Sequence, residues 1–379
     1  MKITKLLYKN KQWEFDNNDE SLSDHAAHLV LGYGCRSILE DPDFFSILKE
    51  KFPNAEIALS SSSGEIFCNE VFDETVSVTV IGFSSTKIKT AQIDIDDFKN
   101  SYEAGKALIS TLPSENLRWV FVLSDGSKVN GSQLVEGLNE GRPDNVLISG
   151  GLAGDGDKFE KTVVGLNQVP ACNKIVAIGF YGNALELSHA SFGGWESFGL
   201  ERTVTHSQNN ILSEIDHKNA LDLYKTYLGK YAEELPSSAL LFPLSLKLTE
   251  NSEPVVRTIL SINEEKNKMI FAGDLPEGSK VRFMKANMDR LIDAANDAAN
   301  QSLFSNPSPK LAIIVSCVGR KLVLGERVSE EIEALGDVFG NDSILTGFYS
   351  YGEISPLKPF DNCALHNQTI TIATVNEIE

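Results

Sequence analysis

A glycine followed at once by an acidic residue recurs at three comparable places along this chain. The pairs are Gly64-Glu65, Gly154-Asp155 and Gly352-Glu353, and each follows a short apolar segment. Another glycine, at the end of a strand-like segment, lies 30, 28 and 33 residues before each turn glycine. Because close backbone approach constrains glycine more than core packing constrains Val or Ile, this spacing indicates duplication of one structural unit.

The duplicated unit has the pattern of a strand, a helix, a second strand, the glycine turn and a third strand. Segments rich in Val, Ile and Phe predict the strands, and apolar residues at helical spacing predict the helices. The expected fold is therefore α+β, with mixed sheets built from repeated β-α-β-β units and helices packed on those sheets. The three copies are predicted over residues 29–83, 120–181 and 312–375.

The distance between copies leaves room for one more. Successive turn glycines are 90 and then 198 residues apart, so about two periods separate the second copy from the third. A degenerate fourth unit over residues 219–284 is one interpretation, and an unrelated insertion is the other.

The run Ser191–Trp195 contains two glycines that interrupt any helix or strand period. This interruption predicts a domain boundary, with two related halves as domains 1–190 and 191–379.

The charge balance argues against two classes of partner. The chain has 53 Asp and Glu against 34 Lys and Arg, a formal net charge of −19. Such a surface repels a nucleic-acid backbone and an anionic membrane, so no nucleic acid and no membrane insertion are expected. The five cysteines are far apart and never form a C-x-x-C pair, which predicts free thiols in a reducing compartment.

Targeting and catalytic signatures are also missing. Residues 1–15 lack the apolar run of a signal peptide, and no stretch of about 18 apolar residues occurs, so a cytoplasmic location is expected. The phosphate-loop, dinucleotide, zinc-protease and serine-hydrolase motifs are absent. The glycine-rich run 150–156 is similar to a phosphate cradle, but Asp155 and Asp157 would repel a phosphate.

Five segments rich in glycine, hydroxyl or aromatic residues follow one another in a fixed order: Ser60–Ile66, Ser149–Gly156, Phe192–Thr205, Gly347–Ser355 and Leu365–Thr371. Together they resemble the FIST family, with its N-terminal and C-terminal FIST domains, over nearly the whole chain. The resemblance implies a sensory input module that binds small ligands such as amino acids. Some members are reported to bind haem and sense nitric oxide. No output segment fits in the chain, so a signalling partner such as a kinase would be a separate protein.

The acids of the three turns are the first candidate ligand-binding residues. A carboxylate at the end of a strand can face a crevice, so Glu65, Asp155 and Glu353 could accept a ligand ammonium or hydroxyl group. The alternative is that they cap backbone N–H groups and hold the turns. Three neighbouring turn residues, Ser62, Ser63 and Gly151, complete this part of the expected pocket.

Arginines and aromatic residues supply the other candidates. Arg202, Arg257 and Arg320 could each bind a ligand carboxylate through both guanidinium nitrogens. The alternative is that they form salt bridges. Tyr349 and Tyr351 have the spacing that places them on one side of an extended segment, as an aromatic wall or as core residues. One further aromatic residue, Trp195, is expected to be a lid or an interdomain packing anchor.

The third turn concentrates these groups, because Tyr349, Tyr351 and Glu353 are close in sequence to His366. The best-supported function is a cytoplasmic, non-catalytic sensor of a small polar metabolite that needs no cofactor. The first alternative is an enzyme of unknown reaction that uses the glycine-turn cleft, in which Cys317 is a nucleophile or simply buried. The second is a haem-based nitric oxide sensor with His366 or His189 as axial ligand.

Overall fold

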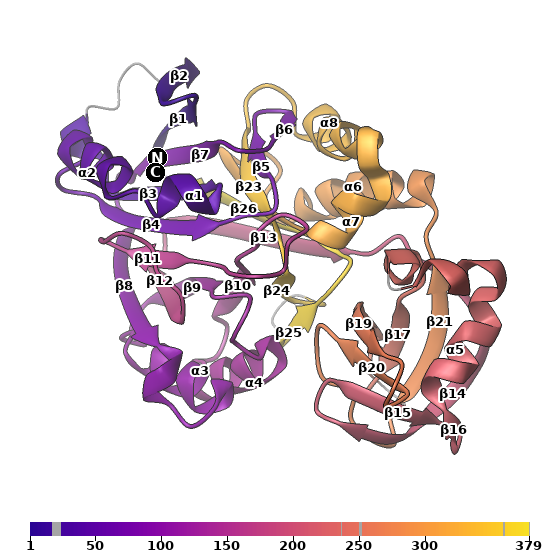
Figure 1. Cartoon of the computed structure of the whole chain (residues 1–379). Coiled ribbons are helices and arrows are strands. Elements are labelled where there is room, and N and C mark those ends of the chain that lie inside the picture. The colour runs from indigo at the N-terminus through magenta and orange to yellow at the C-terminus, as the bar shows by residue number, and fades with distance from the viewer. Residues whose placement is uncertain (17–23, 236, 250–251, 359–360, 379) are drawn as a thin grey trace.

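Four β-sheets with helices packed against them make up the computed structural model of this chain (Figure 1). The structure describes residues 1–16, 24–235, 237–249, 252–358 and 361–378. Three of the sheets have six strands each and the fourth has eight. Sheets of mixed direction combined with helices confirm the α+β prediction.

The three six-stranded sheets are built from three units of the chain. Unit 1 consists of β1 (Lys2–Lys9), β2 (Gln12–Asp16), β3 (Leu29–Gly34), α1 (Arg36–Leu39), α2 (Pro42–Lys51), β4 (Glu56–Ser61), β5 (Glu65–Phe67), β6 (Glu70–Phe72) and β7 (Val76–Gly82). Unit 2 consists of β8 (Lys87–Asp94), α3 (Ser101–Ser110), β9 (Leu117–Ser124), α4 (Gly131–Gly141), β10 (Leu147–Leu152), β11 (Val164–Leu166) and β12 (Lys174–Tyr181). Unit 3 consists of β13 (Leu185–Phe192), α6 (Met288–Ser302), β22 (Leu311–Cys317), α7 (Val318–Leu324), α8 (Val328–Phe339), β23 (Ile344–Ser350), β24 (Gly352–Pro356), β25 (Cys363–His366) and β26 (Ile370–Glu377).

Each unit follows the same path. A parallel strand pair is joined through one or two helices, and an antiparallel strand returns on the far side of the first strand, giving the orders β4-β3-β7, β10-β9-β12 and β23-β22-β26. Just before each returning strand, Glu74, Asn173 and Gln368 adopt the left-handed φ values of 59°, 67° and 61°. Non-glycine residues rarely adopt this conformation, so its recurrence marks equivalent turns. The predicted duplication is therefore correct for all three copies.

The units also exchange strands in a closed cycle. Strand β11 of unit 2 pairs with β4 of unit 1, β24 of unit 3 pairs with β10 of unit 2, and β5 of unit 1 pairs with β23 of unit 3. All three of these pairings are antiparallel. The units thus form a ring with approximate threefold symmetry.

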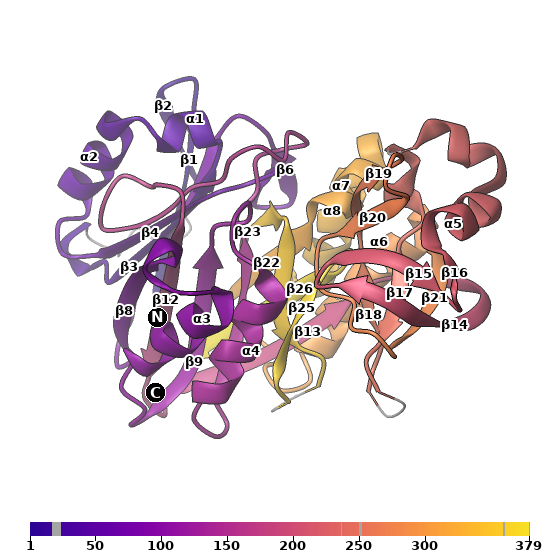
Figure 2. The same cartoon turned by 60° about the horizontal axis from the view of Figure 1, so that its bottom comes forward.

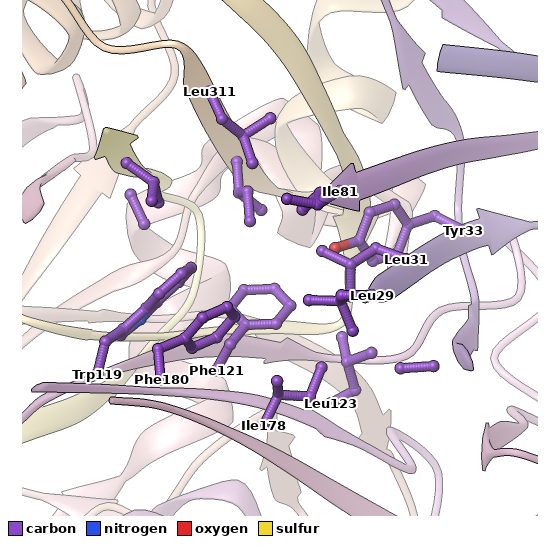
Figure 3. Close-up of a cluster of buried hydrophobic side chains, with 14 of the residues drawn as sticks. Leu29, Leu31, Tyr33, Ile81, Trp119, Phe121, Leu123, Ile178, Phe180 and Leu311 are labelled. Atoms are coloured by element: carbon purple, nitrogen blue, oxygen red, sulfur yellow. The ribbon is translucent and has the colours of Figure 1, made fainter. Parts of the chain in front are cut away.

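The hydrophobic core at the centre of this ring is formed by the inner faces of the three sheets. Figure 3 shows side chains of unit 1 and unit 2 converging with Leu311 of unit 3. Tyr33 stacks on Phe348 with ring centroids 4.7 Å apart, and Trp119 stacks on Phe180 at 4.3 Å. Aromatic pairs of this kind stabilise a core beyond their buried area.

The outer faces of the sheets are covered by amphipathic helices. In α4, Leu134, Val135 and Leu138 are buried, and the side chain of Asn130 accepts a hydrogen bond from Gln133 N–H to cap the helix. In α6 the buried residues are mostly alanines, which allow the helix to lie close to its neighbours. None of the helices in the described segments is long and apolar enough to cross a membrane.

The fourth sheet is inserted into unit 3 between β13 and α6. It lies to one side of the ring, at the lower right of Figure 1, and Figure 2 shows it from a second direction. Its strand order is β18-β17-β21-β14-β15-β20-β19, with β16 beside β15. The elements are β14 (Glu196–Gln208), β15 (Ile211–Ile215), β16 (Lys218–Asn219), α5 (Ala220–Leu228), β17 (Leu244–Lys247), β18 (Val255–Arg257), β19 (Ile259–Asn263), β20 (Lys268–Phe271) and β21 (Lys280–Lys285).

This inserted sheet corrects the interpretation of residues 219–284 as a degenerate fourth unit. Among its described residues all strand pairs are antiparallel, and no helix joins a parallel pair as in the three units. The alternative, an unrelated insertion, is what the topology supports. The chain consists of three related units with an inserted sheet rather than two related halves, and the position between residues 190 and 191 falls inside the unbroken strand β13.

Candidate functional site

Three backbone hydrogen bonds link the units where their strands end, in a repeating pattern. Each goes from one unit to the next around the ring. The donors and acceptors are Gly154 N–H to Ser61 C=O at 3.1 Å, Ser63 N–H to Tyr349 C=O at 2.8 Å, and Tyr351 N–H to Leu152 C=O at 3.1 Å. The turns that the sequence marked as related therefore contact one another in the fold.

Glu65 lies in the turn of unit 1 and is buried. Its carboxyl group accepts hydrogen bonds from Ser62 Oγ at 2.5 Å, from Thr75 Oγ1 at 2.7 Å and from Thr75 N–H at 3.3 Å. Burial raises its pKa to about 7, against the lowering effect of these hydrogen bonds. This environment matches the capping alternative for Glu65.

Glu353 has the same environment in unit 3. It accepts hydrogen bonds from Ser350 Oγ at 2.9 Å, from Thr369 Oγ1 at 2.9 Å and from Thr369 N–H at 3.2 Å. Burial raises its pKa to about 8. It stands opposite Gly151 in the β10–β24 pair, and a Cβ at Gly151 would lie 2.6 Å from Val315, so this turn is packed against the core.

Asp155 is not the counterpart of the two glutamates. In unit 2 the equivalent position is held by Val164. Val164 of β11 pairs with Ser60 of β4, just as Glu353 of β24 pairs with a residue of β10, Gly151. The connection between β10 and β11 is longer than in the other units, and it displaces the glycine-acid pair from the equivalent position. Oδ1 of Asp155 instead accepts a hydrogen bond from Nε of Arg36 at 3.2 Å.

Tyr349 and Tyr351 lie on different sides of the chain, so the predicted aromatic wall is wrong. Tyr349 donates its hydroxyl to Oε2 of Glu331 at 2.7 Å within a buried cluster. Tyr351 stacks on Phe159 with ring centroids 4.5 Å apart, and its hydroxyl accepts a hydrogen bond from Phe159 N–H at 3.0 Å. The cause is that the chain crosses from β23 in one sheet to β24 in another between the two residues.

A cavity of about 300 Å³ lies beside Tyr351, between unit 2 and the inserted sheet. On the unit 2 side it meets the carboxyl ends of β9 and β10 and the N-terminus of α4, a common position for ligand sites in sheets with parallel strands. On the other side it meets β20 and the residues that follow it. The lining residues are Gly126, Ser127, Val129, Asn130, Leu152, Phe159, Asn210, Leu260, Phe271, Ala272, Gly273, Asp274 and Tyr351.

Hydrogen bonds cross this cavity's wall from α4 to the inserted sheet. Nδ2 of Asn130 donates to Oδ1 of Asp274 at 3.0 Å, and Asp274 N–H donates to Oγ of Ser132 at 3.2 Å. Asn210 is held by a hydrogen bond to the Phe271 carbonyl at 2.8 Å. The wall is therefore polar around Asp274 and aromatic around Phe159 and Tyr351.

The two arginines in the candidate set have structural partners. Arg202 pairs with Asp216 at 2.8 Å and donates to the Tyr227 hydroxyl at 2.7 Å, all within the inserted sheet and its helix. Arg257 is buried and donates to the carbonyls of Asp274 at 3.2 Å and Leu365 at 3.0 Å, while burial lowers its pKa to about 10. Arg257 thus supports the cavity wall from behind, and neither arginine lines the cavity.

Trp195 and His366 also lie away from the cavity. Trp195 donates its indole N–H to the Gln368 carbonyl at 2.7 Å and packs among apolar residues where the inserted sheet joins unit 3, as a packing anchor does. Nε2 of His366 lies 2.8 Å from the Ser355 carbonyl oxygen, and burial lowers its pKa to about 4. With Nε2 so engaged, His366 does not fit an axial haem ligand.

The remaining reactive groups are buried or isolated. Burial raises the pKa of Cys317 well above its usual range, which keeps the thiol protonated. Burial lowers the pKa of His189, whose ring lies beside the Pro356 carbonyl. Within the described parts of the chain, no three His, Cys, Asp or Glu residues gather in a way that could hold a metal ion.

Of the residues that line the cavity, only Tyr351 was a candidate from the sequence. Asp274 follows Gly273, so it belongs to another glycine-acid pair. That signal is weak by itself, because a glycine-acid pair also occurs at Gly336-Asp337 within the last turn of α8. A clearer signal exists for Asn130, because Asn is a favoured N-cap residue and the amphipathic segment of α4 follows it.

Two family models match this chain: the FIST N domain over residues 28–218 and the FIST C domain over residues 220–356. An uncharacterized protein of Methanocaldococcus jannaschii is 24% identical over 260 residues, which are 64% of this chain and 48% of that protein. The chain thus spans about half the length of the curated relative it matches. The crystal structure of cyanuric acid hydrolase from A. caulinodans aligns with 95% of this chain and 92% of that chain, at 8% identity and a TM-score of 0.33, which is too low to establish a shared fold. Because the two family models together span most of its residues, the chain belongs to the FIST family of sensory domains.

Proposed function

We propose that this protein senses a small polar metabolite of the amino-acid type, bound without turnover in the cavity between unit 2 and the inserted sheet. The observation that carries the proposal is the double origin of the cavity wall, with Tyr351 and Asn130 on the ring side and Asp274 on the inserted side. A ligand that contacts both sides favours one relative packing of the two parts. Binding is thereby converted into a change of shape.

The polar wall suits a zwitterion. Asp274 supplies a carboxylate for the ligand ammonium group, and its Oδ1 is already oriented by Asn130. The N-terminal turn of α4 and the hydroxyl of Ser127 supply donors for the ligand carboxylate. The stacked rings of Phe159 and Tyr351 supply an apolar surface for a side chain.

The titratable groups around the cavity favour binding over catalysis. Among the described lining residues only Asp274 and Tyr351 have acidic side chains, and burial raises the pKa of Tyr351 to about 12. Its hydroxyl therefore stays protonated at neutral pH. Cys317 and His366, which an enzyme would use as nucleophile and base, do not line this cavity.

The proposed signalling route runs through the contact between α4 and Asp274. Only two hydrogen bonds join Asp274 to this helix among the described residues, so the contact is weak enough to be shifted by a ligand of ordinary affinity. A separate signalling protein in the cytoplasm, such as a kinase, would respond to the rearranged surface.

Calorimetric titration with the twenty common amino acids tests the proposal, together with mass spectrometry of any metabolite released on unfolding. Asp274→Asn should weaken the binding of the amino acid that binds best by about ten-fold or more, because a charge-assisted contact is lost. Asp342→Asn is the matched control, since Asp342 is an exposed acid away from the cavity. The proposal fails if no amino acid binds and none is released, or if both variants bind equally well.

A further inference from the structure

A second cavity, of about 290 Å³, lies where strands β9 and β10 begin, at the opposite end of these strands from the first cavity. It is bordered by Arg118 near the start of β9, Leu147 at the start of β10, and Leu187 and His189 of β13. Phe304, just beyond α6, completes its rim. The cavity therefore lies at the seam between unit 2 and unit 3, and it shares no lining residue with the first cavity.

The cavity concentrates positive charge in a strongly acidic chain. Arg118 and Arg142 both line it, and no described lining residue is acidic, although the net charge of the chain is −19. Two guanidinium groups at one cavity without a lining carboxylate need an explanation, because positive charges elsewhere on this chain are commonly paired with acids.

Neither guanidinium group forms an ion pair with an acid among the residues that the structure describes. Nη1 of Arg142 donates to the carbonyls of Val146 at 3.1 Å and Asp361 at 2.9 Å, and Nη2 donates to Oδ1 of Asn362 at 3.0 Å. These neutral acceptors fix the orientation of the side chain and leave its charge uncompensated. Arg118 forms no hydrogen bond or ion pair within the part of the chain that the structure describes.

Apolar residues form another part of the cavity lining, beside the polar side chains of Asn145, Ser188, His189, Gln301 and Ser305. Leu147 and Leu187 are partly buried and pack against the central core, while the side chain of Phe304 is 88% exposed at the rim. The exposed ring of Phe304 offers an apolar surface at the rim to a ligand in the cavity. Guanidinium groups and apolar walls together call for a ligand with both kinds of surface.

We infer that this cavity binds an organic carboxylate with an apolar body, separately from the amino-acid cavity. The carboxylate lies against Arg118 and Arg142, because planar guanidinium groups match a carboxylate in geometry and charge. The apolar body lies against Leu147, Leu187 and Phe304. The C-terminal end of α6 presents backbone carbonyls near Phe304, so the anionic group belongs at the arginine side.

Calorimetric titration of the full chain with octanoate tests this inference, with octanol and octylamine as ligands of similar length and different charge. We expect octanoate to bind and the other two to bind at least ten-fold more weakly. Arg118→Gln should weaken octanoate binding by about ten-fold, and Arg142→Gln should do so independently. Phe304→Ala should weaken it by a smaller factor.

Arg282→Gln is the control, because Arg282 lies on β21 of the inserted sheet and donates to the Gly199 carbonyl far from this cavity. Its melting temperature and octanoate affinity should match those of the unchanged protein. If octanol bound as tightly as octanoate, the arginines would contribute nothing to recognition of the carboxylate, and the inference would be overturned. Inorganic phosphate that displaces octanoate would assign the arginines to a different anion and overturn it as well.

Discussion

Arg320 and Glu331 form an ion pair, with 2.6 Å between Nη2 and Oε1, in which both side chains are completely buried. Arg320 also donates to the carbonyls of Leu291 at 2.7 Å and Gly193, at the point where the chain leaves unit 3 for the inserted sheet. Glu331 accepts further hydrogen bonds from Ser316 and Tyr349. The pair thus holds α6, α7 and α8 to the exit point of the insertion.

Removing the acid of this pair should be strongly destabilising. Glu331→Gln leaves a buried guanidinium group without a counter-charge, and we expect the free energy of unfolding to fall by about 3–5 kcal/mol. Urea unfolding followed by circular dichroism measures this loss. Glu333→Gln, an exposed acid on the same helix, should unfold like the unchanged protein, and equal loss in the two variants would contradict the special role of the pair.

The buried carboxyl group of Glu353 should make stability depend on pH. Its pKa is about 8 in the folded protein against an ordinary value of 4.5, so the folded state binds more protons between these values than the unfolded state. The stability that Glu353 contributes should therefore fall as the pH rises from about 5 to about 8, by at most about 1.4 kcal/mol per pH unit. Urea unfolding at several pH values measures this slope.

Glu353→Gln removes this titration, so the slope between pH 5 and pH 8 should be smaller in the variant. Because Glu353 does not line the first cavity, amino-acid affinity should not change. A slope identical to that of the unchanged protein would mean that Glu353 is ionised in the folded state. A loss of amino-acid affinity at constant stability would return Glu353 to the ligand site.

The two tyrosines of the third turn should respond differently to loss of their hydroxyl groups. Tyr349→Phe removes a buried hydrogen bond to Glu331 and should lower stability by about 1 kcal/mol without changing amino-acid affinity. Tyr351→Phe removes the hydroxyl that holds Phe159 N–H at the cavity, and should weaken binding several-fold. Parallel calorimetry and thermal melting of both variants separate the two effects, and the same change in affinity for both would contradict the assignment.

The cysteines should react in two classes. All five are free: Cys35, Cys68, Cys172, Cys317 and Cys363. Cys317 and Cys363 are buried, and burial raises the pKa of Cys363 to about 12, so these two should resist alkylation in the folded protein. Mass spectrometry after iodoacetamide treatment should count at most three modified thiols in the native state and five in urea.

The repeat of units 1 and 3 could be predicted from sequence because a glycine-acid pair occupies the same place in both. Gly64 and Gly352 stand directly before Glu65 and Glu353, which hold equivalent positions in the β5–β23 and β24–β10 pairs. The prediction is wrong at Asp155, because the longer connection between β10 and β11 places the Gly154-Asp155 pair away from the position that Glu65 and Glu353 hold in their units.

The cavity was harder to predict because its walls come from segments that only the fold brings together. Asn130, Phe159 and Asp274 are far apart in sequence, and none belongs to a local motif with Tyr351. The topology of the inserted sheet was also hard to predict from sequence. Short strands at irregular spacing have the same apolar pattern whether they pair in parallel or antiparallel. Only the strand register distinguishes a fourth unit from an insertion.

The cyclic exchange of β5, β11 and β24 has a consequence for how this chain can be divided. A single unit cut out of the ring would lose the strand that its neighbour supplies, and its own exchanged strand would project without a partner. Both would be open β-edges, which favour aggregation over independent folding. The cooperative folding element is therefore the whole ring, and fragments that follow the sequence repeat should be insoluble while removal of the inserted sheet alone leaves every ring pairing in place.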